Sequence, residues 1–546
     1  MENKRIQVFD FEALNWNKLY AVGIYAGDRA IYLAEEGKPN AYFAEWLLEN
    51  LESGICAYAH NGGRYDFLFI FEYCEKVGLT PYALKLIHGS IAEFRLRYKD
   101  KKFLFRDSLL ILPASLKRLT QDFDVPHKKL ELDYGKGMKD PRFAEYFKND
   151  LYGLYEVLLS SGLTDHLTIA SCAMANFKKD FYRAAMERNI KAMEMYFRDA
   201  YKGGRVEIFK LYGKDLNYYD VNSLYPSVMY DYEYPLPIAN NFKKVYKFDK
   251  GKLGVYDVSI EIDKLEIPVL HKNISGKFIF PIGRFKGRYY TPEIVKAMEM
   301  GYKVKVIFGY EFIKTDYMFR DYVDYFYMIK TESVGAKKQV AKLLLNSLYG
   351  KFGQKREQEV NAFIKDGTIS NLNFITKKYW DEHSTYIHPE IAGLITAYAR
   401  TRLYEIFQKA GVENVYYCDT DSVITDSTLP VSNTLGELKQ EDKIKEFIAL
   451  APKLYAYSTV KNEIKIKSKG FKAENFTFDD FRKGLSGDIS VFEENRERLA
   501  TIKERYRRTG IDTFAGLLNI QKRLRGLYDK RVVVDGIHTK PLNIIE

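Results

Sequence analysis

The stretch Tyr417-Cys418-Asp419-Thr420-Asp421-Ser422 decides the interpretation of this chain, because it places two carboxylates one residue apart. Residues 415–417 before it and 422–424 after it are strand-like, so we expect a strand, a tight turn and a second strand. Such a turn presents both carboxylates to a hard cation, and Mg²⁺ usually takes one or two protein carboxylates together with phosphates. Taken alone, however, this pattern is more often an ordinary polar hairpin turn.

A further carboxylate, Asp220, ends the strand-like run 216–221 and begins Asp220-Val221-Asn222-Ser223-Leu224-Tyr225-Pro226. The backbone N–H groups of the turn after a strand can hold phosphates. Tyr225 would then lie under the sugar of an incoming nucleotide. Asp220 therefore adds a second carboxylate-bearing turn to the first.

The helix predicted over residues 333–349 carries Lys342, Asn346 and Tyr349 at positions i, i+4 and i+7, which share one face. That face combines a phosphate-binding cation, a polar group and an aromatic ring. The competing interpretation is an ordinary amphipathic helix, but such a helix would place leucine on one stripe.

The first 170 residues carry a second set of acidic side chains. Asp10 and Glu12 alternate on a predicted strand, so they point to the same face. Asp66 follows a Gly-Gly turn, and Tyr146 and Asp150 lie at i and i+4 on the helix predicted over residues 141–159. Four carboxylates and one tyrosine suit phosphodiester hydrolysis with two metal ions, with the tyrosine orienting water.

Composition is ordinary for a globular enzyme, with 46% hydrophobic and 29% charged residues. The 546 residues predict about three to four domains of roughly 100–200 residues. The net charge of +11 permits a polyanionic partner without requiring one. Four scattered cysteines without a CxxC pattern argue against a disulfide framework or a zinc site. We find no signal peptide and no apolar stretch that would span a membrane, so we expect a cytoplasmic location.

The order of Asp220, the Lys342 helix and the Asp419/Asp421 turn resembles family B DNA polymerases, and most closely their protein-primed branch from bacteriophages, linear plasmids and adenoviruses. Three motifs carry the narrower resemblance: Tyr201-Lys202-Gly203-Gly204 resembles YxGG, Thr396-Ala397-Tyr398-Ala399-Arg400 resembles Tx₂AR, and Lys453-Leu454-Tyr455 resembles KxY. The resemblance implies that Tyr201, Gly203, Gly204, Thr396, Arg400, Lys453 and Tyr455 contact template or primer DNA.

The same resemblance implies nucleotidyl transfer with two Mg²⁺ ions, Mn²⁺ being an alternative. Its metal ligands would be Asp220, Val221 and Asp421, with Asp419 as a supporting carboxylate. Lys330 and Lys342 would neutralise phosphates. The residues expected to surround the deoxyribose and the new base pair are Tyr225, Asn346 and Tyr349.

The N-terminal set resembles DEDD proofreading exonucleases of the subtype with tyrosine before the last aspartate. The resemblance implies catalytic or metal-binding roles for Asp10, Glu12, Asp66, Tyr146 and Asp150. It also implies that single-stranded DNA is held by His60, Asn61, Tyr65, Ser108 and Leu109, although Ser108 could instead cap a helix. A family lysine that assists exonucleolysis remains open among Lys128, Lys129, Lys136 and Lys139.

The expected fold is multidomain, α/β and α+β, with an RNase H-like exonuclease domain at 1–170 and a right-hand polymerase. We expect the palm at 171–235 and 388–470, the fingers at 318–353, and the thumb with C-terminal strands at 471–546. The resemblance implies two insertions: one at 236–317, similar to terminal-protein region 1, and one at 354–387, similar to terminal-protein region 2.

Local patterns predict more detail within these regions. Residues 240–315 look β-rich, and residues 355–387 look like a hairpin with its turn at Asp366-Gly367, which could close around template and support strand displacement. Residues 494–531 look basic and helical, either as a thumb gripping duplex phosphates or as a solvated helix. Residues 528–545 look like strands that return to the palm.

The expected partners are a DNA primer–template, single-stranded DNA, dNTPs and a terminal protein primer, with the chain acting as a monomer. Three other functions compete: a silent DNA-binding protein, a nuclease with a vestigial polymerase half, and an RNA-templated or primase-like enzyme. The complete carboxylate sets argue against the first, and the intact Lys342 helix argues against the second. Tyr225 favours deoxynucleotides over the third.

Overall fold

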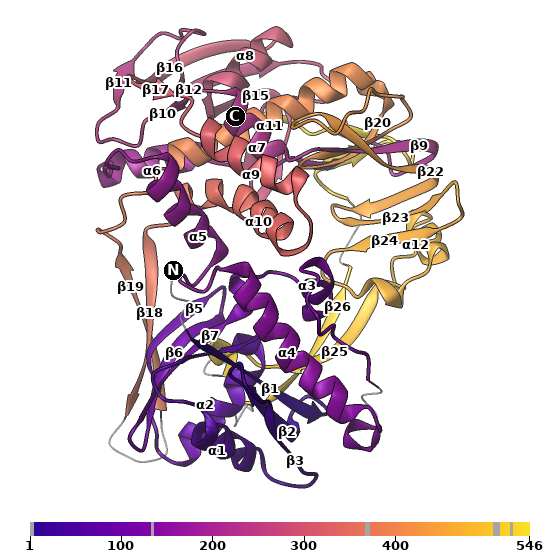
Figure 1. The fold of residues 1–546 in the computed structure, drawn as a ribbon. Helices are drawn as coiled ribbons and strands as arrows, with labels where there is room; N and C mark the ends of the chain where they lie inside the picture. Colours follow the sequence, from indigo (N-terminus) through magenta and orange to yellow (C-terminus); the bar gives the residue numbers. More distant parts are fainter. Residues whose placement is uncertain (1–4, 133–135, 366–371, 506–513, 525–527) are drawn as a thin grey trace.

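The computed structural model describes residues 5–132, 136–365, 372–505, 514–524 and 528–546. The fold is a multidomain α/β structure built around two seven-stranded sheets and one five-stranded sheet. In Figure 1 the N-terminal elements, drawn in indigo and purple, occupy the lower part of the view, and the sheet that contains β9 and β20 lies in the upper part. Among the described residues, none of the helices has both the length and the apolar character needed to cross a bilayer.

The N-terminal sheet has the order β3-β2-β1-β4-β7-β6-β5, in which β4 runs parallel to both β1 and β7. Its strands are β1 Ile6–Leu14, β2 Lys18–Tyr25, β3 Ile31–Ala34, β4 Cys56–Ala59, β5 Tyr82–Ile87, β6 Ser90–Tyr98 and β7 Lys101–Asp107. The helices of this region are α1 Asn40–Asn50, α2 Asp66–Lys76, α3 Leu116–Asp122 and α4 Phe143–Ser161. The predicted strands at 6–11 and 20–24 and the predicted helix at 141–159 are confirmed.

The second seven-stranded sheet has the order β24-β23-β22-β9-β21-β20-β8, and its neighbouring strands are antiparallel. Its strands are β8 Val206–Ile208, β9 Tyr212–Val221, β20 Val415–Asp419, β21 Ser422–Thr425, β22 Leu438–Ala451, β23 Leu454–Thr459 and β24 Ile464–Ser468. The sheet thus combines strands from both segments predicted as palm. Two further helices, α7 Leu224–Asp231 and α11 Pro389–Ala410, pack against each other beside it.

Residues 240–315 are β-rich, as predicted, and also contain a short helix, α8 Thr291–Glu299. The five-stranded sheet has the order β11-β16-β12-β15-β29. Its strands are β11 Phe242–Val245, β12 Gly254–Ile262, β15 Ile282–Tyr290, β16 Lys303–Phe312 and β29 Asn543–Ile545. Two short pairs flank it: β13 Lys272–Ile274 with β14 Lys277–Ile279, and β10 Tyr234–Pro235 with β17 Thr315–Asp316.

Two helices, α9 Arg320–Glu332 and α10 Gly335–Phe352, form the antiparallel pair that carries the predicted fingers. Helix α10 also packs on α5 Ile169–Asn176, and α6 Lys191–Ala200 packs on α11. The predicted hairpin consists of β18 Glu357–Lys365 and β19 Leu372–Trp380, and it runs down beside β5 (Figure 1). Its predicted turn at Asp366-Gly367 lies outside the described residues.

The helical prediction for residues 494–531 is wrong, because this segment forms the antiparallel pair β25 Glu493–Leu499 and β26 Leu517–Arg523. Opposite charges face each other across the pair, as between Glu493 and Arg523, and such pairs stabilise strands. In the described part of this region, the helices are α12 Phe478–Leu485 before the pair and α13 Ile502–Arg505 within it. Part of the basic run, Arg507, Arg508 and Arg525, lies outside the described residues.

The predicted C-terminal strands are confirmed as β27 Arg531–Val533, β28 Thr539–Pro541 and β29. Leu211 N donates to Ile537 O at 2.8 Å, which returns the tail to the second sheet, while β29 pairs in parallel with β15. Short helical turns complete the fold: η1 Gly62–Arg64, η2 Ser108–Leu110, η3 Gly137–Lys139, η4 Phe177–Phe181, η5 Val412–Asn414 and η6 Ala473–Asn475.

Candidate active sites

The first acidic cluster lies where β1 meets α4. Single carboxylate oxygens of Asp10, Glu12 and Asp150 lie within 4.8 Å of one another, close enough to share a metal ion. Asp66 opens α2 beside them, and its Oδ1 accepts a hydrogen bond from Phe11 N at 3.0 Å. The structure therefore brings together the four carboxylates predicted from sequence.

Charge repulsion and burial hold protons on this cluster. Burial, with Asp66 and Glu12 as neighbours, raises the pKa of Asp10 well above its usual range. Burial likewise raises the pKa of Glu12 to about 7 and that of Asp66 to about 8. Asp150 Oδ1 is buried and, within the described ranges, has no hydrogen-bond partner. A divalent cation would satisfy that oxygen and relieve the repulsion, so the residues fit a metal site.

Lys129, one of the four lysines that sequence leaves open, lies at the acidic cluster. Its ammonium group contacts Asp150 Oδ2 and lies 3.2 Å from the Tyr146 hydroxyl. Burial alone would lower its pKa, but the carboxylate of Asp150 raises it, so Lys129 is charged at neutral pH. Lys128 instead pairs with Asp124, away from the cluster. No sequence signal could select Lys129, because it lies in an irregular segment without a spacing rule.

The predicted single-strand contacts are partly internal to the protein. His60 Nδ1 lies 2.9 Å from Ser108 Oγ, and its Nε2 lies 2.8 Å from Ala114 O. Burial lowers the pKa of His60 to about 4, so the ring is neutral, donates to Ala114 and accepts from Ser108. Ser108 is fully buried and supports His60 in this structure. The alternative that Ser108 caps a helix is wrong, since Asp107 caps η2 by accepting from Leu109 N.

Two further residues predicted to bind single-stranded DNA, Asn61 and Tyr65, flank η1 just before Asp66. Asn61, half-buried, adopts a left-handed conformation with φ of 63° just before η1. Tyr65 is half-buried, and its ring meets Phe69 edge-on at 5.3 Å. Contact of these residues, of Ser108 and of Leu109 with DNA stays a prediction.

The second acidic cluster lies at the β20–β21 turn. Asp220, near the end of β9, pairs in register with Ser422, and Val221 N donates to Asp421 O at 2.8 Å. Thr420 adopts a left-handed φ of 63°, which makes the turn tight. The strand, turn and strand predicted from sequence are confirmed, and they bring Asp220 beside Asp419 and Asp421.

Burial, followed by the nearby charge of Asp421, raises the pKa of Asp220 to about 7. Burial also raises the pKa of Asp421. A divalent cation would relieve the repulsion that Asp220 meets from the nearby charge of Asp421. Asp419 differs, because its Oδ1 lies 2.7 Å from Lys453 Nζ.

The residues predicted to bind the nucleotide lie on α9 and α10, except Tyr225, which lies on α7. Lys330 Nζ donates to Ser223 Oγ at 2.8 Å, next to the Asp220 turn. Burial, together with nearby Lys342 and Lys338, lowers the pKa of Lys330. The rings of Tyr225 and Tyr349 stack with centroids 4.4 Å apart. Lys342 and Asn346 are exposed on the same helix as Tyr349 and are available to a ligand.

The residues of the three motifs have unequal exposure. Tyr201, Gly203, Gly204 and Lys453 are at least partly exposed, whereas Thr396, Arg400 and Tyr455 are buried. The Thr396 hydroxyl donates to Gly393 O, and Arg400 NH1 donates to the carbonyl oxygens of Lys202 and Gly203. In this structure Thr396 and Arg400 therefore stabilise the protein's own backbone.

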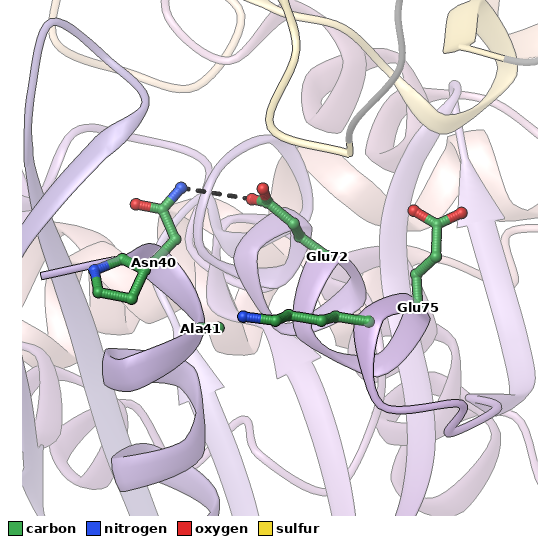
Figure 2. Close-up of a pocket in the computed structure, with 6 residues that line it drawn as sticks. Asn40, Ala41, Glu72 and Glu75 are labelled. Atoms are coloured by element: carbon green, nitrogen blue, oxygen red, sulfur yellow. Dashed lines mark hydrogen bonds between the residues drawn. The ribbon is translucent and has the colours of Figure 1, made fainter. Parts of the chain in front are cut away.

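A separate small pocket lies between α1 and α2, and Figure 2 shows Asn40 donating a hydrogen bond to Glu72 across it at 3.3 Å. Its lining also includes Glu75 and Lys76. None of these residues belongs to either acidic cluster. The pocket is therefore not the site to which the carboxylates point.

A family model described as DNA polymerase type B, organellar and viral, matches residues 52–156 and 141–428. The chain belongs to the organellar and viral type B DNA polymerases. A probable DNA polymerase of Ascobolus immersus is 27% identical to this type B chain over 530 residues, which cover 80% of the chain and 44% of that relative. The DNA-directed DNA polymerase of Enterobacteria phage PRD1 is 29% identical over 511 residues, which cover 85% of each protein.

This type B chain spans only about half the length of the fungal relatives that it matches. Among solved structures, phi29 DNA polymerase in complex with primer-template DNA and incoming nucleotide substrates matches with a TM-score of 0.77. The identity is 22%, and the match covers 95% of this chain and 99% of that one. The two proteins share the multidomain fold predicted from sequence.

Proposed function

We propose that this type B chain is a DNA-directed DNA polymerase with a 3′–5′ proofreading exonuclease. The observation that carries the proposal is the presence of two separate acidic clusters on two different sheets, each supplied with the cations and aromatic rings that its reaction needs. Asp220 and Asp421 would serve polymerisation. Asp10, Glu12 and Asp150 would serve hydrolysis.

In polymerisation, Asp220, Val221 and Asp421 would hold two Mg²⁺ ions. When bound, Mg²⁺ would lower the pKa of the primer 3′-hydroxyl and neutralise the triphosphate. Lys330 and Lys342 would bind the phosphates from the fingers side, because Lys330 donates to Ser223 beside Asp220 and Lys342 lies near Lys330. The stacked pair of tyrosines beside that turn would fix the sugar and the new base pair.

In hydrolysis, Tyr146 would orient the attacking water, since its hydroxyl lies beside Lys129 at the edge of the cluster. Lys129 would hold Asp150 in place and neutralise charge that develops on the scissile phosphate. Asp10, Glu12, Asp66 and Asp150 would hold the metal ions. Asp150 Oδ1 is buried and has no hydrogen-bond partner among the described residues, which supports a metal-binding role for this carboxylate.

The hairpin β18–β19 would support strand displacement. It packs against β5, and its Glu359 pairs with Lys503 of α13, so it bridges the N-terminal and C-terminal regions. Deleting residues 357–384 should abolish strand displacement while extension on open template continues. Unchanged displacement would contradict this role.

Initiation would use a separate terminal protein as primer, with the chain acting as a monomer in the cytoplasm. The Tyr201–Gly204 motif and the two insertions support this part of the proposal. Its test is covalent labelling: transfer of a radiolabelled dNMP to a co-encoded protein, dependent on Asp421, is the expected result. Labelling that persists in Asp421→Ala would contradict it.

The main test is a labelled primer–template assay with Mg²⁺ and dNTPs that compares wild type, Asp421→Ala and Asp66→Ala. Asp421→Ala should lose extension but keep 3′ degradation, and Asp66→Ala should do the reverse. A wild type that degrades but never extends would leave a nuclease as the better account. A wild type that extends while neither substitution matters would overturn the assigned residues.

A further inference from the structure

Glu293 of α8 forms an ion pair deep inside the protein. Its side chain is 2% exposed, and Oε1 accepts from Arg400 Nε at 3.1 Å and from Arg400 NH2 at 2.8 Å. Although burial alone would raise its pKa, Arg400 and His271 hold the pKa of Glu293 at about 2. Glu293 is thus the buried counter-charge of Arg400 at every ordinary pH.

The NH1 group of Arg400 contacts the loop of residues 202–204, which lies against the β20–β21 turn. This turn, which carries Asp419 and Asp421, is called the polymerase turn below. Arg400 NH1 donates to Lys202 O at 2.9 Å and to Gly203 O at 2.7 Å. The next residue, Gly204, lies against Thr420, since a Cβ at Gly204 would be 2.7 Å from Thr420 Cγ2. Thr420 is the residue between the two carboxylates of the β20–β21 turn.

The same loop is held a second time by the first insertion. Thr420 N donates to Arg205 O at 2.7 Å, and Arg205 NH1 donates to Pro268 O at 2.8 Å. Pro268, like Glu293, belongs to residues 236–317. Two independent contacts therefore connect this insertion to the backbone on which the polymerase turn rests.

We infer that Glu293 is a positioning residue for the polymerase turn, and that it acts through Arg400 on the loop of residues 202–204. The inference rests on the proposed polymerase function. If it is correct, the first insertion, residues 236–317, helps to position the polymerase site in addition to any contact with the terminal protein.

The mechanism is geometric. Without the carboxylate, the guanidinium of Arg400 stays buried with no counter-charge and must move. Gly203 and Gly204 would follow it, and Thr420 would shift with them. Because misplacement by about 1 Å is costly in a catalytic site, the turn would bind metal less tightly and nucleotide addition would slow.

The test compares Glu293→Gln with Glu299→Gln, an exposed glutamate on the same helix. In Glu293→Gln we expect kcat for nucleotide addition to fall about tenfold and the Mg²⁺ concentration required for extension to rise. The KM for dNTP, the affinity for primer–template and the exonuclease rate should stay unchanged. Glu293→Asp should restore part of kcat, because it keeps the charge. Glu299→Gln should behave as wild type.

A second measurement is independent of turnover. In a background that carries Asp10→Ala, Glu12→Ala and Asp150→Ala, which removes the three carboxylates that can share a metal ion in the N-terminal cluster, Mn²⁺ binding is measured by electron paramagnetic resonance. Glu293→Gln should weaken the remaining site, whether or not the chain extends primers. A wild type that never extends primers would refute the proposed polymerase function. The Mn²⁺ affinity would still test whether Glu293 positions the β20–β21 turn.

Three outcomes overturn the inference. The first is a Glu293→Gln protein with wild-type kcat and wild-type Mn²⁺ affinity. The second is an equal loss of extension and exonuclease activity with a lowered melting temperature, which indicates a general structural role. Weaker primer–template binding at unchanged kcat would also overturn it, because Arg400 would then act on DNA directly.

Discussion

The ammonium nitrogen of Lys453 lies 2.7 Å from Oδ1 of Asp419, so the lysine of the KxY motif is paired with the first carboxylate of the β20–β21 turn. The Lys453 side chain is 41% exposed and that of Asp419 is 18% exposed. A primer phosphate that reaches this edge would compete with Asp419 for the lysine. The pair would therefore connect primer binding to the carboxylate beside Asp220 and Asp421, the proposed metal ligands.

Replacing Lys453 with glutamine should weaken primer–template binding uniformly across sequences and reduce the slope of log affinity against log salt by about one. The reason is the loss of a single phosphate contact. The measurement is a fluorescence anisotropy titration at several salt concentrations. Lys461→Gln, an exposed lysine at the end of β23, is the matched control. An unchanged slope in Lys453→Gln would show that the lysine serves Asp419 alone.

Sequence alone predicts the carboxylates that lie close together along the chain. Asp419 and Asp421 flank one turn, and Asp10 and Glu12 alternate on one strand, so spacing was enough to place each pair. The three-dimensional meeting of Asp220 with that turn was expected only by resemblance. The register Asp220 to Ser422 provides it here, through antiparallel pairing of β9 with β21.

Sequence could not predict what depends on tertiary contacts. Lys129 lies in an irregular segment, and only the fold brings it to Asp150, 21 residues away. Arg400 was expected at DNA, yet its burial depends on Glu293, which is 107 residues distant. Residues 494–531 are predicted as helix but contain the strands β25 and β26. Charged residues such as Glu493 and Arg523 stabilise these strands by pairing across them, and the sequence of one strand carries no signal of that pairing.

Lys129→Met should slow 3′ degradation of single-stranded DNA by roughly 100–1,000-fold and leave primer extension unchanged. The substitution removes the positive charge beside Asp150 and the Tyr146 hydroxyl, and loss of one electrostatic group in an active site has this order of effect. Lys128→Met is the control, because Lys128 pairs with Asp124 instead. If both variants degrade DNA at the wild-type rate, Lys129 has no catalytic role.

The raised pKa values of the exonuclease cluster predict a pH-dependent response to metal. In the folded state Glu12 titrates at about 7 instead of 4.5. Between these values the folded chain holds more protons than the unfolded chain, so stability without metal falls as pH rises through this window. Mg²⁺ binds the deprotonated carboxylates, so it should raise the melting temperature more at pH above about 7 than at about pH 5.

Thermal unfolding with chelator and with Mg²⁺, at both pH values, measures this effect. Glu12→Gln removes one titrating group, so its melting temperature without metal should depend less on pH than that of wild type. A metal effect that is equal at both pH values would contradict the assigned cluster.

Tyr225→Val should raise ribonucleotide incorporation by roughly 10–200-fold, the range available from a change in pocket shape. The Tyr225 ring stacks on Tyr349 beside the Asp220 turn, where it would exclude a 2′-hydroxyl. Single-turnover incorporation of dNTP and rNTP gives the ratio. Tyr349→Phe keeps an aromatic ring in the stack and should leave this ratio near the wild-type value. An unchanged ratio in Tyr225→Val would remove the steric role.

The contact between the C-terminal strand pair and the N-terminal domain should control processivity. Arg505 of α13 binds Glu75 of α2 at 2.8 Å and lies 4.0 Å from the centre of the Phe514 ring. Phe514 in turn meets Phe71 of α2 edge-on at 5.6 Å. This contact joins α2 of the N-terminal domain to Arg505 and Phe514 between β25 and β26, so breaking it would free this end of the strand pair.

Arg505→Glu should therefore shorten the product length per binding event, and more so at high salt, while single-nucleotide addition stays at the wild-type rate. The matched rescue is Arg505→Glu combined with Glu75→Arg, which restores opposite charges at the same contact. A trap assay with excess unlabelled DNA measures product length. If the double variant remains as short as the single one, the charge pair is not the cause. If Arg505→Glu keeps wild-type length, the contact does not retain DNA.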